Sequence, residues 1–207
     1  MKIALIGSGN IGAGLGRAWA RHGHTIVYGV RDRAEPELTA LCSEIGATAA
    51  PVADAPRDAD VVVMGIPWAA LDDALAALGD LSGKVVIDCM NAVERPAVVL
   101  HFGRTTSWSE EMQKKMPGAR VVKSFNAQGA ETLANPVYGG VRAVNFYCGD
   151  DADAKRIVKG LIEDVGFEAI DAGALKAARL LEPLMLLWLA SGQALGTRDF
   201  GFHLLRR

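Results

Sequence analysis

Short apolar runs alternate with helical patterns along almost the whole chain. Several of these runs carry Val, Ile and Leu without polar alternation, as expected where helices cover both faces of a strand. Seven runs are predicted to be strands, at residues 2–6, 25–28, 60–66, 85–89, 120–125, 144–148 and 168–170. Strands that alternate with helices in this way predict a doubly wound, mostly parallel α/β sheet.

The helical patterns between these strands mostly end at a glycine or a proline, which are common helix stops. Helices are predicted at residues 11–21, 36–45, 69–78, 109–116, 152–165 and about 175–195. The last of them is the most apolar element of the chain. We expect one domain over residues 1–207, with a core of about 1–128 and a short C-terminal α/β extension of about 129–207 that ends in this helix.

Two irregular stretches follow predicted strands. One covers residues 91–107 and includes Pro96, and the other covers residues 126–140. Long loops in a compact α/β domain are more often functional than idle. Both begin at the carboxyl ends of strands, where open α/β sheets bind their ligands.

A glycine-rich loop joins the first predicted strand to the first predicted helix. Its sequence is Gly7, Ser8, Gly9, Asn10, Ile11 and Gly12. The first glycine permits a tight turn, the second lets backbone approach a pyrophosphate, and the third lets the helix pack on the strand. The helix N-terminus offers free N–H groups to the anion. This context predicts a dinucleotide site in a Rossmann-type sheet.

The choice of dinucleotide is expected at the end of the second strand, where NAD-specific folds usually carry a carboxylate. Here Arg31 and Arg33 flank Asp32. Arg31 could pair with a 2′-phosphate, worth roughly 1.5–3 kcal/mol. NADP(H) is therefore favoured as the cofactor, while Asp32 keeps NAD open and the arginines could instead be solvated surface residues.

Candidates for proton transfer beside a nicotinamide are poor. His22 and His24 flank a turn at the wrong end of the sheet, His203 is near the terminus, and His101 lies in the irregular stretch from which it could reach the site. We therefore predict no catalytic side chain. The hydride partner is then a second redox cofactor, and the protein mainly positions two rings.

Composition excludes several classes of protein. The 22 basic and 24 acidic residues give a net charge of −2 without a basic stripe, so nucleic acid is not an expected partner. Three widely spaced cysteines suggest neither a disulfide framework nor a metal site. Residues 184–190, the most apolar stretch, are too short to cross a bilayer, and the start of the chain lacks a signal peptide. We expect a cytoplasmic protein with no membrane partner.

Motifs along nearly the whole chain resemble a known family, the NADPH-dependent reductases of the deazaflavin coenzyme F420. The matching motifs after the glycine loop lie at residues 27–31, 66–68, 122–126, 148–151, 171–175 and 178–182. The resemblance implies that residues 8–12 hold the pyrophosphate and that Arg31 holds the 2′-phosphate. It also places Ile66, Pro67 and Trp68 along the nicotinamide half.

Two departures from this family pattern bear on the ligands. Val30 stands where family members often carry a Ser or Thr as a second phosphate contact. Asn126 stands where the archaeal enzymes place a histidine near the deazaflavin, and the Phe125–Asn126 pair is similar to bacterial relatives and to the flavin-reducing domain of the membrane metalloreductases known as STEAP proteins. The second substrate is therefore expected to be F420, FMN or FAD.

Several residues admit a structural role beside a functional one. Trp68 either caps the nicotinamide pocket or covers a helix start, and Asn126 either contacts a ring or organises its loop. Asp150 and Asp151, and the pair Ser107 and Glu110, are expected to cap helices. The apolar residues around Trp188 are expected to form core or a subunit interface, so a homodimer is plausible.

The favoured function is hydride transfer between NADP(H) and F420 or a flavin. Two alternatives stay open. One is an NADP(H)-binding sensor module without turnover, which would equally lack acid–base residues. The other is a small imine or carbonyl reductase like the pyrroline-carboxylate reductases, whose N-terminal half begins similarly but which add a long helical dimerisation region.

Overall fold

A computed structural model describes residues 1–94 and 98–207. Its strands include β1 (Lys2–Ile6), β2 (Thr25–Val30), β3 (Thr48–Pro51), β4 (Val61–Met64), β5 (Val85–Asp88), β8 (Arg120–Lys123), β11 (Val144–Gly149) and β12 (Glu168–Asp171). These strands form one sheet in the order β12-β11-β8-β5-β4-β1-β2-β3. All neighbours are parallel except β11 and β8, which are antiparallel. The mostly parallel α/β sheet is therefore confirmed.

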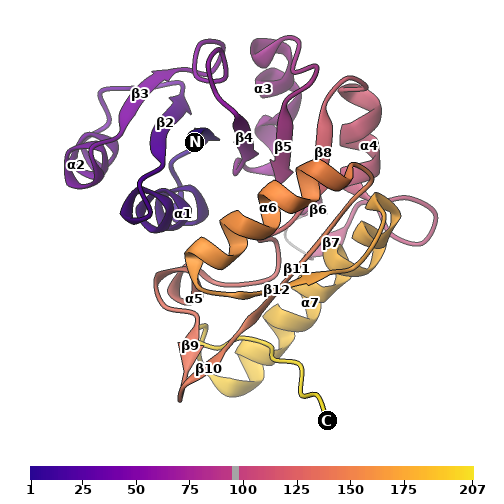
Figure 1. Cartoon of the computed structure of the whole chain (residues 1–207). Coiled ribbons are helices and arrows are strands. Elements are labelled where there is room, and N and C mark those ends of the chain that lie inside the picture. Colours follow the sequence, from indigo (N-terminus) through magenta and orange to yellow (C-terminus); the bar gives the residue numbers. More distant parts are fainter. Residues whose placement is uncertain (95–97) are drawn as a thin grey trace.

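Helices cover both faces of this sheet (Figure 1). They are α1 (Asn10–Arg21), α2 (Pro36–Ile45), α3 (Leu71–Leu78), α4 (Trp108–Lys115), α5 (Ala130–Ala134), α6 (Ala152–Val165) and α7 (Ala178–Leu195), with 3-10 turns η1 (Trp68–Ala70) and η2 (Leu175–Ala177). Successive strand residues point to opposite faces. Ile3 and Leu5 pack in one core with α1, α2 and α6, whereas Ala4 and Ile6 pack in a second core with α3 and α4. These two cores are why the strands are apolar on both sides.

Each strand and helix predicted from the sequence is found, and most differences are at the ends. The helices at 36–45 and 152–165 have the predicted bounds. The edge strand β3 and the short helix α5, within the irregular stretch 126–140, were not predicted. Two small hairpins also lie in the irregular stretches, formed by β6 (Val93–Glu94) with β7 (Val99–Leu100) and by β9 (Val137–Tyr138) with β10 (Val141–Arg142). Pro96 lies outside the described residues.

The C-terminal strands extend past the carboxyl edge of the parallel strands. In β11, Cys148 and Gly149 pair with the carboxyl end of β8. The earlier residues of β11 lie past that end of β8 and pair with β12. Helix α7 follows, drawn in yellow under β11 and β12 in Figure 1. The extension thus places α7 at the edge of the sheet where ligands are expected. None of the described helices has the length and apolarity needed to span a membrane.

Helix α7 has one buried and one exposed side. Trp188 is 4% exposed and stacks on Phe200 with ring centroids 5.5 Å apart, as a core residue does. Leu180 and Leu187 are 72% and 56% exposed. The expected subunit interface on this helix therefore remains a prediction.

Candidate functional site

The glycine loop has the backbone geometry that its sequence predicts. Gly7 has a φ of +100°, and a Cβ there would lie 2.8 Å from the Gly65 carbonyl oxygen. A Cβ at Gly12 would lie 2.3 Å from the Gly7 carbonyl oxygen. Both positions therefore require glycine, the first for the turn and the second for the close approach of α1 to its own loop.

The second glycine of the loop, Gly9, lies beside open space at the N-terminus of α1. Gly9 is the N-cap of α1, no side chain caps this helix end, and its first turn has no acidic residue. A Cβ at Gly9 would meet nothing within 4 Å. The first N–H groups of α1 are thus left without a side-chain acceptor beside open space, and they carry the partial positive charge of the helix dipole. This end of the helix fits a phosphate.

A cleft of about 700 Å³ runs from this loop to the ends of β2 and β4. Six of the predicted site residues line it, namely Gly7, Ser8, Gly9, Arg31, Ile66 and Pro67. Asp32 and Glu35 also line it. The space available suits a nucleotide rather than a small metabolite alone.

The charged residues at the end of β2 have different surroundings. Arg31 is exposed in the cleft, and among residues 1–94 and 98–207 no carboxylate pairs with it. Asp32 Oδ1 accepts a hydrogen bond from the backbone N–H of Ala34 at 2.8 Å, so this carboxylate organises the turn. Arg33 lines a separate hollow. Arg31 is the cation that faces the cleft.

Five predicted site residues lie outside the lining of this cleft. Asn10, Ile11 and Gly12 form the first turn of α1 behind the loop. Trp68 is half-buried and packs edge-on against Trp108, with ring centroids 4.8 Å apart. The fifth residue is Asn126.

Asn126 is 7% exposed and fixed by its neighbours. Its Nδ2 group donates to the Leu181 carbonyl oxygen at 2.7 Å and to Asn91 Oδ1 at 3.0 Å, while Asn91 Nδ2 donates to the Asn126 carbonyl oxygen at 2.9 Å. Phe125 before it has a φ of +57°, which is uncommon for a bulky residue. Both amide hydrogens of Asn126 are therefore used, and Oδ1 is the group left for a ligand.

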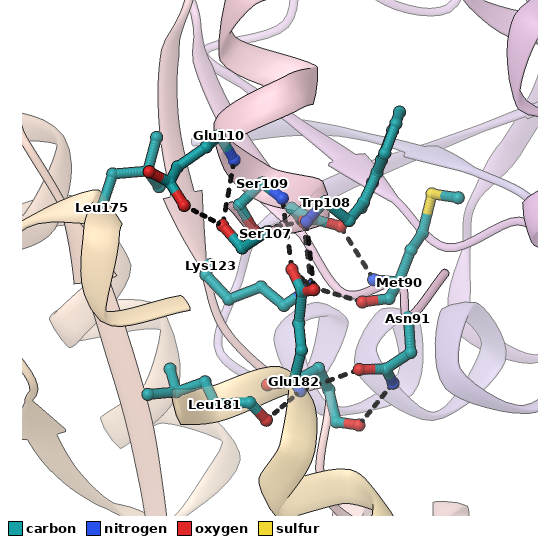
Figure 2. A network of polar contacts seen from close by, with 12 residues as sticks. Met90, Asn91, Ser107, Trp108, Ser109, Glu110, Lys123, Leu175, Leu181 and Glu182 are labelled. Atoms are coloured by element: carbon teal, nitrogen blue, oxygen red, sulfur yellow. Dashed lines mark hydrogen bonds and ion pairs between the residues drawn. The ribbon is translucent and has the colours of Figure 1, made fainter. Parts of the chain in front are cut away.

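A buried charge cluster, which the sequence did not predict, lies at the ends of β5 and β8 (Figure 2). Lys123 Nζ lies 3.0 Å from Asp88 Oδ2 and 3.5 Å from Glu182 Oε1, and it also donates to the Met90 carbonyl oxygen. Ser109 Oγ donates to Asp88 Oδ2 at 2.6 Å. The Lys123 and Asp88 side chains have no exposed surface. We call Asp88, Lys123 and Glu182 the buried charge cluster.

Glu182 joins this cluster to the start of α4. Its two carboxylate oxygens accept hydrogen bonds from the backbone N–H groups of Trp108 at 3.0 Å and Ser109 at 3.2 Å. Burial raises the pKa of Glu182, and the Lys123 ammonium offsets this effect in part. Burial disfavours the charged form of Lys123, but the Asp88 and Glu182 carboxylates outweigh it and raise its pKa. The cluster thus holds α7 against α4 and the sheet.

The capping roles predicted for Asp151 and Ser107 are confirmed, whereas Asp150 does not cap α6, because its Oδ1 accepts from the backbone N–H of Leu175 at 2.9 Å at the start of η2. Asp151 Oδ1 accepts from the N–H of Ala154 at 2.7 Å at the start of α6, and Ser107 Oγ accepts from the N–H of Glu110 at 3.3 Å at the start of α4. Glu110 also pairs with Arg179 at 2.7 Å. This ion pair between α4 and α7 holds the pKa of Glu110 below its ordinary value.

Comparison with known proteins agrees with the motifs of this site. A sequence model described as "NADP oxidoreductase coenzyme F420-dependent" matches residues 2–92. A crystal structure from Arthrobacter sp. FB24, of a candidate F420-dependent NADP reductase, covers 100% of both chains with 34% identity and a TM-score of 0.90. The F420-dependent NADP reductase of Methanothermobacter thermautotrophicus is 29% identical over 201 residues, which are 89% of this chain and 86% of that protein.

A metalloreductase is also a relative. The metalloreductase STEAP3 of Rattus norvegicus is 29% identical over 189 residues, covering 90% of this chain. The chain spans 37% of the length of that relative. With the full-length match to the Arthrobacter structure, these findings show that the chain belongs to the F420-dependent NADP oxidoreductase family.

Proposed function

We propose that this protein transfers a hydride between NADP(H) and a deazaflavin of the F420 type or a flavin. One observation supports it above the others: a single cleft connects the uncapped N-terminus of α1 to the unpaired Arg31. These are two anion-binding groups at the two places where a phosphorylated dinucleotide carries its pyrophosphate and its 2′-phosphate. An unphosphorylated dinucleotide would leave Arg31 without a partner.

Each group of site residues has a proposed task. Arg31 binds the 2′-phosphate, as a guanidinium can form two parallel bonds to it. The pyrophosphate is held by the glycine loop, that is by Gly7, Ser8, Gly9, Asn10, Ile11 and Gly12. The rings are positioned by Ile66, Pro67, Trp68 and Asn126. When bound, NADPH supplies the hydride, and the protein holds the second ring system over the nicotinamide and excludes water.

The test is NADPH consumption by the purified protein with F420, FMN or FAD as the acceptor in parallel reactions. We expect turnover with F420 or with a flavin, and faster turnover with NADPH than with NADH. A Gly9→Val variant is the control, because any acceptor reduction that it still shows does not depend on NADPH bound in the cleft. Absence of turnover with all three acceptors, in a protein that binds NADPH, would overturn the proposal and favour a sensor module.

A further inference from the structure

We propose that His101, oriented by Glu94, donates the proton that accompanies hydride transfer to the second substrate. The inference rests on the proposed function and goes beyond it, because the sequence predicts no catalytic side chain. Reduction of a deazaflavin or flavin ring by a hydride leaves a negative charge on the ring unless a proton follows. A positioned acid at that point accelerates such a step by typically 10²–10⁴-fold.

The first observation is the pairing of His101 with a carboxylate. His101 Nδ1 and Glu94 Oε1 are in hydrogen-bond contact across the β6–β7 hairpin. Since an ionised carboxylate only accepts, Nδ1 carries the hydrogen, and the pair fixes the orientation of the ring. No hydrogen-bond partner of Nε2 is found among residues 1–94 and 98–207. The ring nitrogen left for a ligand is therefore Nε2.

The second observation is the aromatic cluster that joins the imidazole to the cleft. Its ring lies 5.7 Å from the Trp68 ring and 4.7 Å from the Phe102 ring, measured between centroids. Trp68 directly follows Pro67, which lines the cleft at the end of β4. His101 does not line the cleft itself but is joined to it through Trp68, and its side chain is 46% exposed, which lets it regain a proton from water.

The other histidines are occupied elsewhere. His24 Nε2 lies 2.9 Å from Asp164 Oδ2, at the start of β2 and so at the opposite edge of the sheet. His22 Nδ1 contacts the Ala18 carbonyl oxygen, and His203 Nδ1 contacts the Arg142 carbonyl oxygen. Of the four histidines, His101 is the one in contact with the aromatic cluster that adjoins the cleft. His203, which is also exposed, is a matched control.

Charged groups on the neighbouring helices are mostly paired with other residues. Trp68 and Trp108, which join this aromatic cluster, connect it to α3 and α4. The pairs on these two helices are Asp72 with Lys115, Glu110 with Arg179 and Glu111 with Lys114. Asp73 lines the cleft itself. Glu94 is therefore the carboxylate in contact with the His101 ring.

The proposed step is balanced as follows. The C4–H bond of the reduced nicotinamide breaks, and the hydrogen leaves with both bonding electrons as a hydride. This hydride forms a new bond to the acceptor ring. The Nε2–H bond of protonated His101 breaks, and its proton goes to a ring nitrogen of the acceptor. NADPH is oxidised to NADP⁺, the acceptor is reduced by two electrons, and solvent returns the proton to His101.

The activity test compares His101→Gln with wild type and with His203→Gln, over a range of pH. We expect the His101→Gln variant to lose about 10²-fold in kcat with unchanged affinity for NADPH. Its rate should depend less on pH than that of the wild type. Glu94→Gln keeps an acceptor for Nδ1–H and should lose less. A His101→Gln variant within twofold of wild type at every pH would overturn the inference, whereas inactive wild type would overturn the proposed function instead.

A second readout does not depend on turnover. In the complex with NADP⁺ and the oxidised acceptor, no hydride is available, and the imidazole signals of the four histidines can be followed by NMR. The His101 signal, assigned by its loss in His101→Gln, should shift when the acceptor is added, while the His203 signal should not. If both signals stay in place while the acceptor binds, His101 does not touch it, and the inference is wrong.

Discussion

The carboxyl edge of the sheet carries two polar regions of opposite character. The cleft beside β1 and β2 has groups without partners, namely the uncapped N-terminus of α1 and Arg31. The buried charge cluster at the ends of β5 and β8 has several partners for each charge, and no water reaches Lys123 or Asp88. The two regions lie at the same edge of one sheet with β4 between them, so the fold alone does not explain the difference.

The difference follows from solvent. A charge that remains in water costs little folding free energy when it is unpaired, so Arg31 needs no partner within the protein. A charge removed from water costs several kcal/mol unless neighbours replace the lost hydration, so Lys123 requires partners. The comparison separates groups that are arranged for binding from groups that hold the structure together. Substitutions in the two regions should therefore have opposite consequences for stability and for ligand affinity.

The largest effect is expected from Lys123→Met, which leaves the Asp88 and Glu182 carboxylates buried without their cation. We expect a loss of about 3–5 kcal/mol in the free energy of unfolding, measured by urea denaturation. Lys159→Met is the matched control, because Lys159 pairs with Glu163 at 3.6 Å on an exposed helix surface with both side chains about half exposed. The control should lose no more than about 0.5 kcal/mol. Equal losses would remove the distinction between the two regions.

Gly9→Val should abolish NADPH binding without unfolding the protein. The backbone of Gly9 has a φ of −65°, which valine adopts, and a Cβ there meets no protein atom within 4 Å. The added side chain would occupy the space of the pyrophosphate, so we expect the Kd for NADPH to rise more than about 100-fold, or roughly 2.7 kcal/mol. Gly12→Ala should instead lower the Tm, because its Cβ would overlap the Gly7 carbonyl oxygen. Both are measured by NADPH titration and thermal unfolding.

Arg31→Ala tests the choice of dinucleotide. Loss of a charge-assisted contact to the 2′-phosphate should raise the KM for NADPH by about 10- to 100-fold and leave the KM for NADH within twofold. The Tm should not change, since Arg31 has no ion-pair partner among the described residues. Arg33→Ala, in a separate hollow, is the control. Equal changes for both dinucleotides would show that Arg31 does not bind the 2′-phosphate.

The smallest effect is expected where α4 meets α7. The hydrogen bond from Arg179 lowers the pKa of Glu110 in the folded protein, so this pair stabilises the fold above the ordinary pKa of a carboxyl group and is lost as the pH falls. Glu110→Gln should cost about 1 kcal/mol at neutral pH and progressively less as the pH falls below the ordinary pKa of a carboxyl group and through the lowered pKa of Glu110. Thermal unfolding at several pH values measures this difference. A constant difference at all pH values would mean that Glu110 acts through packing rather than charge.

Local signals explain what the sequence could predict. The helix at 152–165 begins after Asp151, which caps it, and ends at Gly166 in the left-handed conformation, so both ends have a residue-level cause. The glycine loop is equally local. The edge strand β3 was not predicted, because Thr48–Pro51 contains two alanines and a proline, which have low strand propensity, and forms only through pairing with β2.

Contacts between distant residues explain what the sequence could not predict. Asp88, Lys123 and Glu182 come from three separate elements, and two of them resemble ordinary polar residues at strand ends. Glu182 gave the one available signal, since it is a lone acid in the most apolar helix of the chain. Asn126 was singled out from its place after a strand, but its bonds to Asn91 and Leu181 depend on how α7 packs.

The isolation of Arg31 also has an evolutionary consequence. Gly29, two residues earlier, is constrained, because a Cβ there would lie 2.7 Å from the end of the Ile6 side chain and 3.0 Å from the Cβ of Ala55, whereas Arg31 is exposed and outside every core. A lineage can therefore exchange the residue at position 31 without a compensating change in the interior, and with the proposed role of Arg31 this exchange would also change the preferred nicotinamide coenzyme. The same property makes this position a practical starting point for engineering coenzyme use.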